Sequence, residues 1–191
     1  MANAKHDNVS IRLESDGHTF SPECAAASGA VEVVVSTVKT ALVPAELFVE
    51  DDARAALAAV GYAPTTSERV VYSAAVSGVV AVMAMDVTCY DALVERYGQS
   101  LCFSSPLLER VDIQRGVHLK LDGELLYVRV YDDVMLFAEV VEVKSDGDIL
   151  YYLESIHRVY DIYNMYARAT GDTGRLKRLC GRSFKNLETC K

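Results

Sequence analysis

The amino-acid sequence predicts an α/β protein made of two similar halves. Each half reads as a strand, a tight Asp-Gly turn, a second strand, a third strand and a helix. The two turns are Asp16-Gly17 and Asp122-Gly123, and an Asp-Gly pair between alternating apolar residues is a strong local signal for a β-hairpin. The repeated order of elements indicates an internal duplication.

The strands of the first half are predicted from short runs rich in β-branched residues, several of which alternate apolar with polar side chains. Pro44 is expected in the first turn of a helix, where its missing N–H leaves no helical hydrogen bond unmade. Acidic residues suit the start of the next helix, and Gly61 is a suitable stop. Asp86 or Thr88 is expected to cap the last helix. The predicted strands are residues 9–14, 18–20, 31–36, 37–43, 69–73 and 79–85, and the predicted helices are 44–48, 50–60 and 89–97.

The second half is predicted from the same signals. Pro106 follows two serines and is expected near the start of a short helix. Residues 145–148 are expected to cap a longer helix on which apolar residues recur at spacings of three and four. The predicted strands are residues 117–121, 124–131, 134–142 and 163–170, and the predicted helices are 106–110, 145–160 and 174–187.

Composition and charge exclude several classes of function. The chain carries 27 acidic and 19 basic side chains, a formal net charge of −8. We expect no nucleic-acid binding and no membrane binding through a basic patch, because both need clustered Lys and Arg. The polar N-terminus lacks the apolar core of a signal peptide, and the longest apolar run, residues 74–85, is too short to span a bilayer. We therefore expect a cytoplasmic protein.

The cysteines also favour a reducing compartment. There are five, an odd number without a C-x-x-C spacing, so neither a disulfide framework nor a zinc site is predicted. Mostly buried, reduced thiols fit this pattern best. They are Cys24, Cys89, Cys102, Cys180 and Cys190.

Four local sequence features occur in a characteristic order. They are residues 10–20 (Ser-Ile-Arg-Leu-Glu-Ser-Asp-Gly-His-Thr-Phe), 41–48 (Ala-Leu-Val-Pro-Ala-Glu-Leu-Phe), 104–108 (Ser-Ser-Pro-Leu-Leu) and 146–153 (Asp-Gly-Asp-Ile-Leu-Tyr-Tyr-Leu). With them the chain resembles an uncharacterised bacterial family, typical of Bacteroidetes, that has an actin-like fold and is akin to the actin-like proteins of type IV pilus assembly. The resemblance implies two ribonuclease H-like lobes of βββα repeats in an actin-like ATPase arrangement. We place these lobes at residues 1–103 and 104–191.

The resemblance also implies where a nucleotide would bind. In active members of the superfamily, ATP and a divalent metal lie between the lobes, and hairpins rich in Gly, Ser and Thr hold the phosphates through successive backbone N–H groups. Here the matching residues are Asp16 and Gly17 in the first hairpin and Asp122 and Gly123 in the second. Neither hairpin has the expected Asp-x-Gly-(Ser/Thr) spelling, and residues 171–174 are the nearest substitute for the usual Gly-Gly adenine signature. The implied site is therefore degenerate.

Other candidate residues have structural explanations that we favour. Asp16 with Asp122, and Asp146 with Asp148, could hold a hard cation, but hairpin turns and helix starts also prefer Asp. The histidines could supply a zinc ligand or a general base, but we expect ordinary surface residues. The tyrosines of residues 151–166 could stack a ligand, but we expect core or interface positions. The histidines are His6, His18, His118 and His157.

The sequence leaves two functions open. No P-loop, G-x-G-x-x-G, H-E-x-x-H or G-x-S-x-G motif is present, so we name no catalytic residue and no metal ligand. The first hypothesis is a catalytically inactive actin-like protein, without a cofactor, that acts as an interaction or assembly module. Its partner would be an unknown protein or a second copy of itself. The alternative is a divergent Mg-dependent ATP-binding ATPase or kinase-like phosphotransferase, because phosphoryl transfer needs mainly positioning and metal electrostatics.

Overall fold

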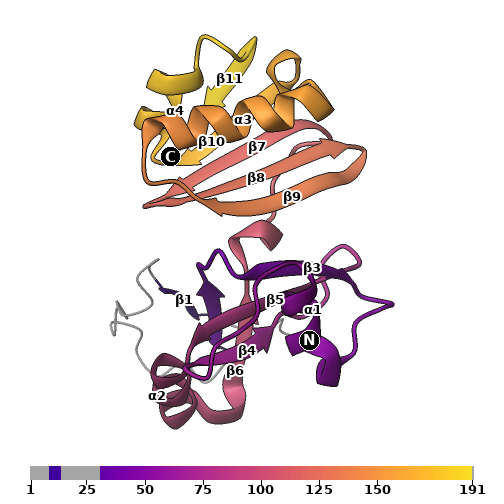
Figure 1. The fold of residues 1–191 in the computed structure, drawn as a ribbon, viewed down its shortest axis with the longest axis vertical. Helices are drawn as coiled ribbons and strands as arrows, with labels where there is room; N and C mark the ends of the chain where they lie inside the picture. The colour runs from indigo at the N-terminus through magenta and orange to yellow at the C-terminus, as the bar shows by residue number, and fades with distance from the viewer. Residues whose placement is uncertain (1–8, 14–30, 191) are drawn as a thin grey trace, which may run out of the picture. The chain divides into compact units, whose positions relative to one another are not determined.

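Figure 1 shows the computed structural model, which describes residues 9–13 and 31–190. The chain divides into two compact units, Met1–Leu108 and Glu109–Lys191, here called unit 1 and unit 2. The sequence-based boundary after residue 103 falls inside a strand of unit 1, and the structure ends that unit after the short 3-10 helix that follows. No helix within residues 9–13 and 31–190 is long and apolar enough to cross a membrane.

Unit 2 contains the predicted order of three strands and a helix in full. β7, β8 and β9 are antiparallel neighbours, and β10 joins β7 in parallel, which gives the sheet order β11-β10-β7-β8-β9 (Figure 1). α3 connects β9 to β10, and α4 connects β10 to β11. The elements are β7 (Arg115–Asp122), β8 (Leu125–Asp132), β9 (Val134–Glu142), α3 (Asp146–Tyr160), η4 (Ile162–Asn164), β10 (Tyr166–Gly171), α4 (Thr173–Cys180) and β11 (Asn186–Thr189).

The predicted closing helix of unit 2 is wrong in its second half. The sequence pattern predicts a helix over residues 174–187, but α4 ends at Cys180 and the chain returns to the sheet as β11. Gly181 follows the helix, and the N–H groups of Ser183 and Phe184 both bond to the Cys180 carbonyl oxygen. β11 then pairs in parallel with β10. Pairing with an open sheet edge has outweighed the local helical pattern.

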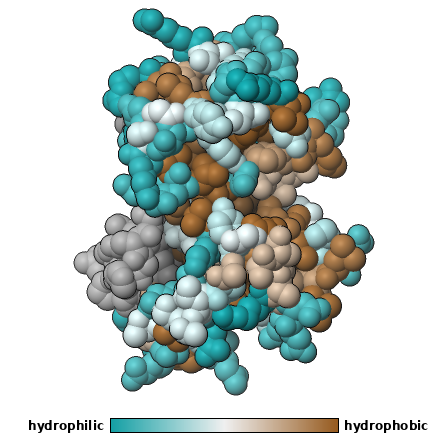
Figure 2. Space-filling model, in the orientation of Figure 1, coloured by the Kyte–Doolittle hydropathy of each residue, from teal (hydrophilic) through white to brown (hydrophobic). Residues whose placement is uncertain are grey.

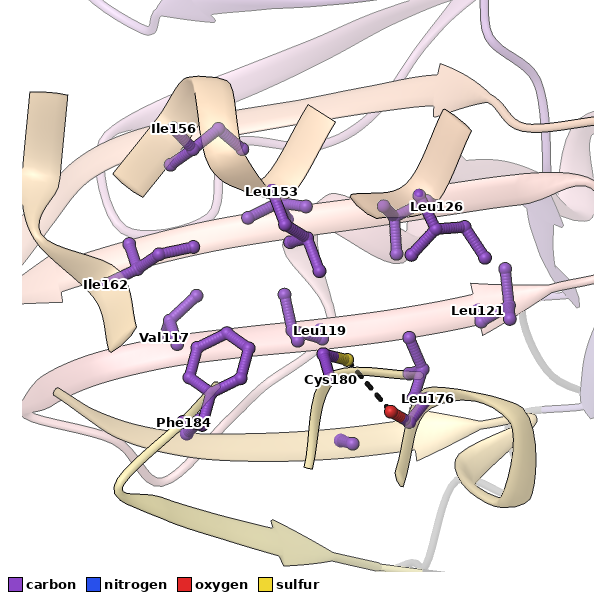
Figure 3. Close-up of a cluster of buried hydrophobic side chains, with 14 of the residues drawn as sticks. Val117, Leu119, Leu121, Leu126, Leu153, Ile156, Ile162, Leu176, Cys180 and Phe184 are labelled. Carbon is purple, nitrogen blue, oxygen red and sulfur yellow. Dashed lines mark hydrogen bonds between the residues drawn. The ribbon is translucent and has the colours of Figure 1, made fainter. Parts of the chain in front are cut away.

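The core of unit 2 lies between one face of the sheet and the two helices (Figure 3). Alternate residues of β7 and β8 point into it, because successive side chains of a strand face opposite sides. The Cys180 thiol donates a hydrogen bond to the Leu176 carbonyl oxygen at 2.8 Å, and burial raises the pKa of Cys180 to about 11. This cysteine is therefore a core residue. The labelled core residues are Val117, Leu119, Leu121, Leu126, Leu153, Ile156, Ile162, Leu176, Cys180 and Phe184.

The described residues of unit 1, 9–13 and 31–108, form two three-stranded sheets that meet at one bridge. β3, β5 and β4 are antiparallel, whereas β1, β2 and β6 are parallel. An isolated parallel bridge joins Ser73, directly after β4, to Phe103 of β6. Apolar side chains cover both faces of β5, with α1 on one side and α2 on the other. The elements are β1 (Val9–Leu13), β2 (Val31–Val35), β3 (Thr40–Pro44), η1 (Glu50–Asp52), α1 (Ala53–Ala59), β4 (Glu68–Tyr72), β5 (Val79–Asp86), α2 (Val87–Tyr97), η2 (Gly98–Ser100), β6 (Leu101–Ser104) and η3 (Pro106–Leu108).

Pro44 is the last residue of strand β3, and the helix predicted to start there is wrong. Pro44 pairs with Val79 on an outer strand of the sheet, where a residue without an N–H is tolerated. The N–H of Leu47 bonds to the Pro44 carbonyl oxygen at 2.9 Å, and the N–H of Ala45 bonds to the Gly78 carbonyl oxygen at 2.8 Å. These bonds make the segment a turn.

The first predicted hairpin lies mostly outside the described residues. β1 pairs with β2 in parallel, so these two strands are not the arms of one hairpin. The antiparallel group of unit 1 is made instead by β3, β5 and β4. The predicted cap at Asp86 is confirmed, because its side chain accepts from the N–H groups of Thr88 at 2.9 Å and Cys89 at 3.2 Å.

Candidate functional site

The turn between β7 and β8 contains two of the four predicted nucleotide-binding residues. Asp122 pairs with Leu125, so Gly123 and Glu124 form the turn. The φ angle of Gly123 is +59°, and Glu124 is not among the residues with positive φ. Positive φ at the first central position alone is the pattern of a type II′ turn, whereas an Asp-Gly pair at the two central positions favours type I′. The turn therefore lies one residue later than the sequence predicts. Local turn chemistry explains both Asp122 and Gly123, and their use by a phosphate stays a prediction.

The other two predicted residues, Asp16 and Gly17, lie outside the described residues, as do His6 and His18. Asp122 and Gly123 are therefore the only described members of the predicted site. Within residues 9–13 and 31–190, no three side chains of His, Cys, Asp or Glu gather closely enough to hold a metal ion.

Asp146 and Asp148 serve the start of helix α3. Ser145 and Asp148 form a reciprocal capping box, with the Ser145 N–H 2.8 Å from the Asp148 carboxylate. That backbone N–H is the main cause that lowers the pKa of Asp148. The Asp146 carboxylate lies 2.7 Å from Nε of Arg175, which lowers the pKa of Asp146. The predicted role at the helix cap is confirmed for Asp148, whereas Asp146, in the first turn of α3, forms an ion pair with Arg175 of α4.

Residues 171–174, the nearest substitute for an adenine signature, connect the end of strand β10 to the start of helix α4. A Cβ atom on Gly171 would lie 2.0 Å from the Leu121 carbonyl oxygen, so only glycine fits at this approach. The Asp172 N–H bonds to the same oxygen at 2.8 Å, and the Asp172 side chain caps α4 by accepting from the Arg175 N–H at 2.9 Å. These contacts account for the glycine and the aspartate without a nucleotide.

The face of the unit 2 sheet opposite the core carries a buried polar cluster. His118 and Lys120 of β7 and Arg129 of β8 are only 2%, 4% and 1% exposed. Thr170 of β10 and Glu109, the first residue of unit 2, complete it. The prediction that His118 is an ordinary surface residue is wrong. The alternation in β7 and β8 places these side chains on one face, but alternation alone does not show that the face is covered.

The hydrogen bonds of His118 define its tautomer. Its Nδ1 lies 2.9 Å from an Arg129 guanidinium nitrogen, and its Nε2 lies 3.0 Å from the Thr170 hydroxyl. A guanidinium only donates, so Nδ1 accepts and Nε2 carries the proton that is donated to Thr170. Burial, with the nearby cations Arg129, Lys120 and Arg168, lowers the pKa of His118 to about 3. Both ring nitrogens are engaged, so His118 does not serve as a free base.

The same cluster fixes the start of unit 2 to its sheet. The Lys120 ammonium forms an ion pair with the Glu109 carboxylate, and the Arg129 guanidinium donates to the Glu109 carbonyl oxygen. Glu109 is thus bound through both its side chain and its backbone. A partly buried ion pair with further hydrogen bonds favours one defined arrangement of the chain, at a desolvation cost. The cluster is suited to anchoring its own chain.

Two adjoining hollows, of about 310 and 530 Å³, lie on unit 1. Both are lined by Arg69 and Tyr72, and the larger reaches Tyr90 and Phe103. The Arg69 guanidinium lies 5.2 Å from the centre of the Tyr90 ring, and the Tyr90 and Phe103 rings are 6.1 Å apart. Sequence reasoning missed this group, because its members come from β4, α2 and β6 and are far apart along the chain.

The outer strand β9 and helix α3 expose apolar side chains on unit 2. Val134 and Leu136 of β9 are 64% and 47% exposed, and Tyr151 and Val159 of α3 are 78% and 72% exposed. Figure 2 shows hydrophobic surface over the part of unit 2 that carries these elements in Figure 1. We call the outward side of residues 134–142 the β9 edge. It is the described feature best suited to contact another chain.

Comparison with solved structures confirms the predicted fold. The whole chain superposes on 94% of a protein from Bacteroides thetaiotaomicron with an actin-like ATPase fold and unknown function, at a TM-score of 0.75 and 17% sequence identity. The cytoplasmic domain of EpsL, an inner membrane component of the type II secretion system of Vibrio cholerae, matches at a TM-score of 0.39 and 12% identity, over 95% of this chain and 84% of that domain. No family model and no curated protein matches the chain. The chain therefore has an α/β, actin-like ATPase fold.

Proposed function

We propose that this actin-like-fold chain acts as a protein-interaction or assembly module and catalyses no reaction. The observation that carries the proposal is the β9 edge, an outer strand of nine residues that exposes Val134 and Leu136; helix α3 of the same unit exposes Tyr151 and Val159. Exposed apolar side chains of this size mark candidate sites of contact with other proteins. An outer strand adds unpaired backbone groups that another chain can use.

The described half of the predicted nucleotide site supports the same proposal. The Gly123-Glu124 turn is a two-residue hairpin turn, which leaves no longer loop of successive N–H groups between β7 and β8. Gly171 lies against the Leu121 carbonyl oxygen, and the Asp172 carboxylate accepts a hydrogen bond at the start of α4. Asp146 and Asp148 are engaged at α3.

Thermal unfolding with nucleotides tests whether the chain binds a nucleotide, as the alternative, an ATP-dependent enzyme, requires. A ligand that binds the folded state at 100 times its Kd stabilises it by about 2.7 kcal/mol. We expect no Mg-dependent rise in Tm with millimolar ATP, ADP or GTP. A Mg-dependent rise that Asp122→Asn removes would overturn the proposal and favour the alternative, a divergent ATP-binding enzyme. Asp133→Asn is the matched control, because Asp133 lies at the other end of β8.

A further inference from the structure

Building on the proposed interaction role, we propose that the β9 edge binds an extended, basic segment of another protein, which adds to the unit 2 sheet as a further strand. In this mode of recognition the backbone of the sheet edge supplies the hydrogen bonds and the edge side chains supply selectivity. The backbone geometry, the composition of the edge and its charge each support this partner.

The backbone geometry shows which residues are offered to a partner. The N–H of Val143 bonds to the Glu124 carbonyl oxygen at 2.7 Å, so this pair is a hydrogen-bonded one. Hydrogen-bonded and non-hydrogen-bonded pairs alternate in an antiparallel ladder. In the observed register Ala138, Val140 and Glu142 are therefore at non-hydrogen-bonded positions towards β8. Their N–H and C=O groups point away from β8, to the outer side.

The composition of the edge leaves this stretch open to pairing. Natural outer strands are protected by Lys, Pro, bulges or covering segments. Residues 134–142 contain no Lys, Arg or Pro. A bulge between Val130 and Tyr131 of β8 interrupts the ladder opposite the first residues of β9, so that end is protected. The stretch from Ala138 to Glu142 continues in regular register.

Charge complementarity selects the partner. The charged residues within β9 are Glu139 and Glu142, and both are acidic. Lys144, just after the strand, lies 3.5 Å from the Glu142 carboxylate in an exposed ion pair, which a basic partner residue would have to replace or share. Glu139 accepts a hydrogen bond from the Tyr152 hydroxyl, which holds its carboxylate on the α3 side. If β9 paired with β9 of a second copy of the chain, four glutamates would lie on one short ladder. Each of the two chains also carries a net charge of −8, so their pairing is disfavoured. A strand with two basic residues three positions apart matches the acids, because opposite charges across strands stabilise and like charges destabilise.

The apolar part of the surface defines the remaining positions of the partner strand. Phe137 packs against Tyr160 of α3 with ring centres 5.4 Å apart. Val159, which is 72% exposed, follows Tyr152 by seven residues. Seven residues make about two helical turns, so Val159 lies on the same side of α3 as Tyr152. That side faces β9, because the Tyr152 hydroxyl donates to Glu139. β-Branched side chains between the basic residues would cover this apolar surface.

A labelled peptide tests the proposal on the full chain. The probe is fluorescein-Thr-Lys-Val-Thr-Lys-Val, and its charge-reversed counterpart has Glu at both Lys positions. Fluorescence anisotropy at low salt is expected to show binding of the basic peptide and at least about tenfold weaker binding of the acidic one, a difference of about 1.4 kcal/mol. Equal binding of the two peptides, or no binding of the basic one, would overturn the proposal.

Two variants separate strand addition from adhesion to an acidic surface. Ala138→Pro removes one outward N–H without removing a bond to β8 and is expected to weaken the basic peptide about tenfold, whereas Ala138→Ser keeps the N–H and is expected to bind within about twofold of wild type. Glu142→Lys, at a half-exposed position, tests charge if Ala138→Pro does not fold. It is expected to abolish the preference between the peptides, because Glu139 remains and each peptide then meets one opposite charge and one like charge. Equal weakening by Ala138→Pro and Ala138→Ser, or an unchanged preference in Glu142→Lys, would contradict strand addition.

Two further readouts distinguish this proposal from its alternatives. A dimer in sedimentation velocity that Ala138→Pro dissociates would show a second copy at the edge and overturn the basic partner. The nucleotide experiment tests the interaction role separately. A chain without a Mg-dependent shift that also fails to bind the peptide would retain the proposed role and lose this partner.

Discussion

The two faces of the unit 2 sheet are made by the same strands and are held in different ways. One face places Val117, Leu119 and Leu121 against α3 and α4 in a core of apolar side chains. The other buries His118 and Lys120 among hydrogen bonds and an ion pair. Stability on the first face depends on filled volume. Stability on the second depends on satisfied polar groups, so pH and single charges affect it.

At neutral pH the largest effect is expected from a cavity in the apolar face. Leu119→Ala should lower the free energy of unfolding of unit 2 by about 3 kcal/mol, since Leu119 is fully buried. Urea unfolding and hydrogen exchange of the β7 amides measure this loss. Leu136→Ala on the half-exposed edge is the control, with an expected change below about 0.5 kcal/mol. A similar loss of unfolding free energy in both variants would show that burial in the apolar face does not determine the size of the loss.

The next largest effect is expected from the centre of the polar face. Arg129→Leu removes the donor to His118 Nδ1 and to the Glu109 carbonyl oxygen. We expect a loss of about 2 kcal/mol, because buried acceptors are left unsatisfied. Arg115→Leu is the control, because its ion pairs with Asp132 and Asp133 are exposed, and little change is expected there. A stable Arg129→Leu chain would mean that the polar face tolerates apolar packing.

Acid should destabilise unit 2 through His118. The pKa of His118 is about 3 in the folded chain and 6.5 in its ordinary state, so the unfolded chain binds the proton first as pH falls. The contribution is complete above pH 6.5 and decreases by about 1.4 kcal/mol per pH unit between there and pH 3. Urea unfolding at several pH values measures this slope. His118→Gln, which can still accept from Arg129 and donate to Thr170, should have a shallower slope, and an identical slope would contradict the assignment.

The smallest effect is expected from the ion pair at the edge of the cluster. Lys120→Met retains the buried stem and removes the charge, which leaves a Glu109 carboxylate that is 34% exposed. Water can solvate that carboxylate in part, so we expect a loss of about 1 kcal/mol or less. Urea unfolding of Lys120→Met and of the wild-type chain measures this loss of unfolding free energy. A loss larger than that of Arg129→Leu would show that the charge of Lys120, and not the guanidinium network, holds Glu109.

Local patterns were sufficient for most elements and for the structural residues of the candidate site. The pattern of residues 117–121 predicted strand β7, and the Asp-Gly pair predicted the hairpin at Asp122. Ser145 to Asp148 predicted the cap of α3. Each of these depends on neighbours within a few residues, where backbone geometry and side-chain hydrogen bonds act directly.

Three of the wrong predictions involve a distant segment. Pro44 looked like the start of a helix, but β5 was available for pairing. The residues after Cys180 looked helical, but the edge of β10 took them as β11. His118 looked like a surface residue, because nothing near it in the sequence shows that Arg129 and Thr170 lie on either side of its ring.

The sequence by itself determined most of the strands, the place of the hairpin, the helix caps and the α/β class, because these follow from residue spacing and from short-range hydrogen bonds. Only the tertiary structure decided that the polar face of β7 is buried, that Glu109 is bound at its centre, and that β9 is an outer strand. Burial and strand order arise when segments far apart in the chain meet. No local pattern records which segments these are.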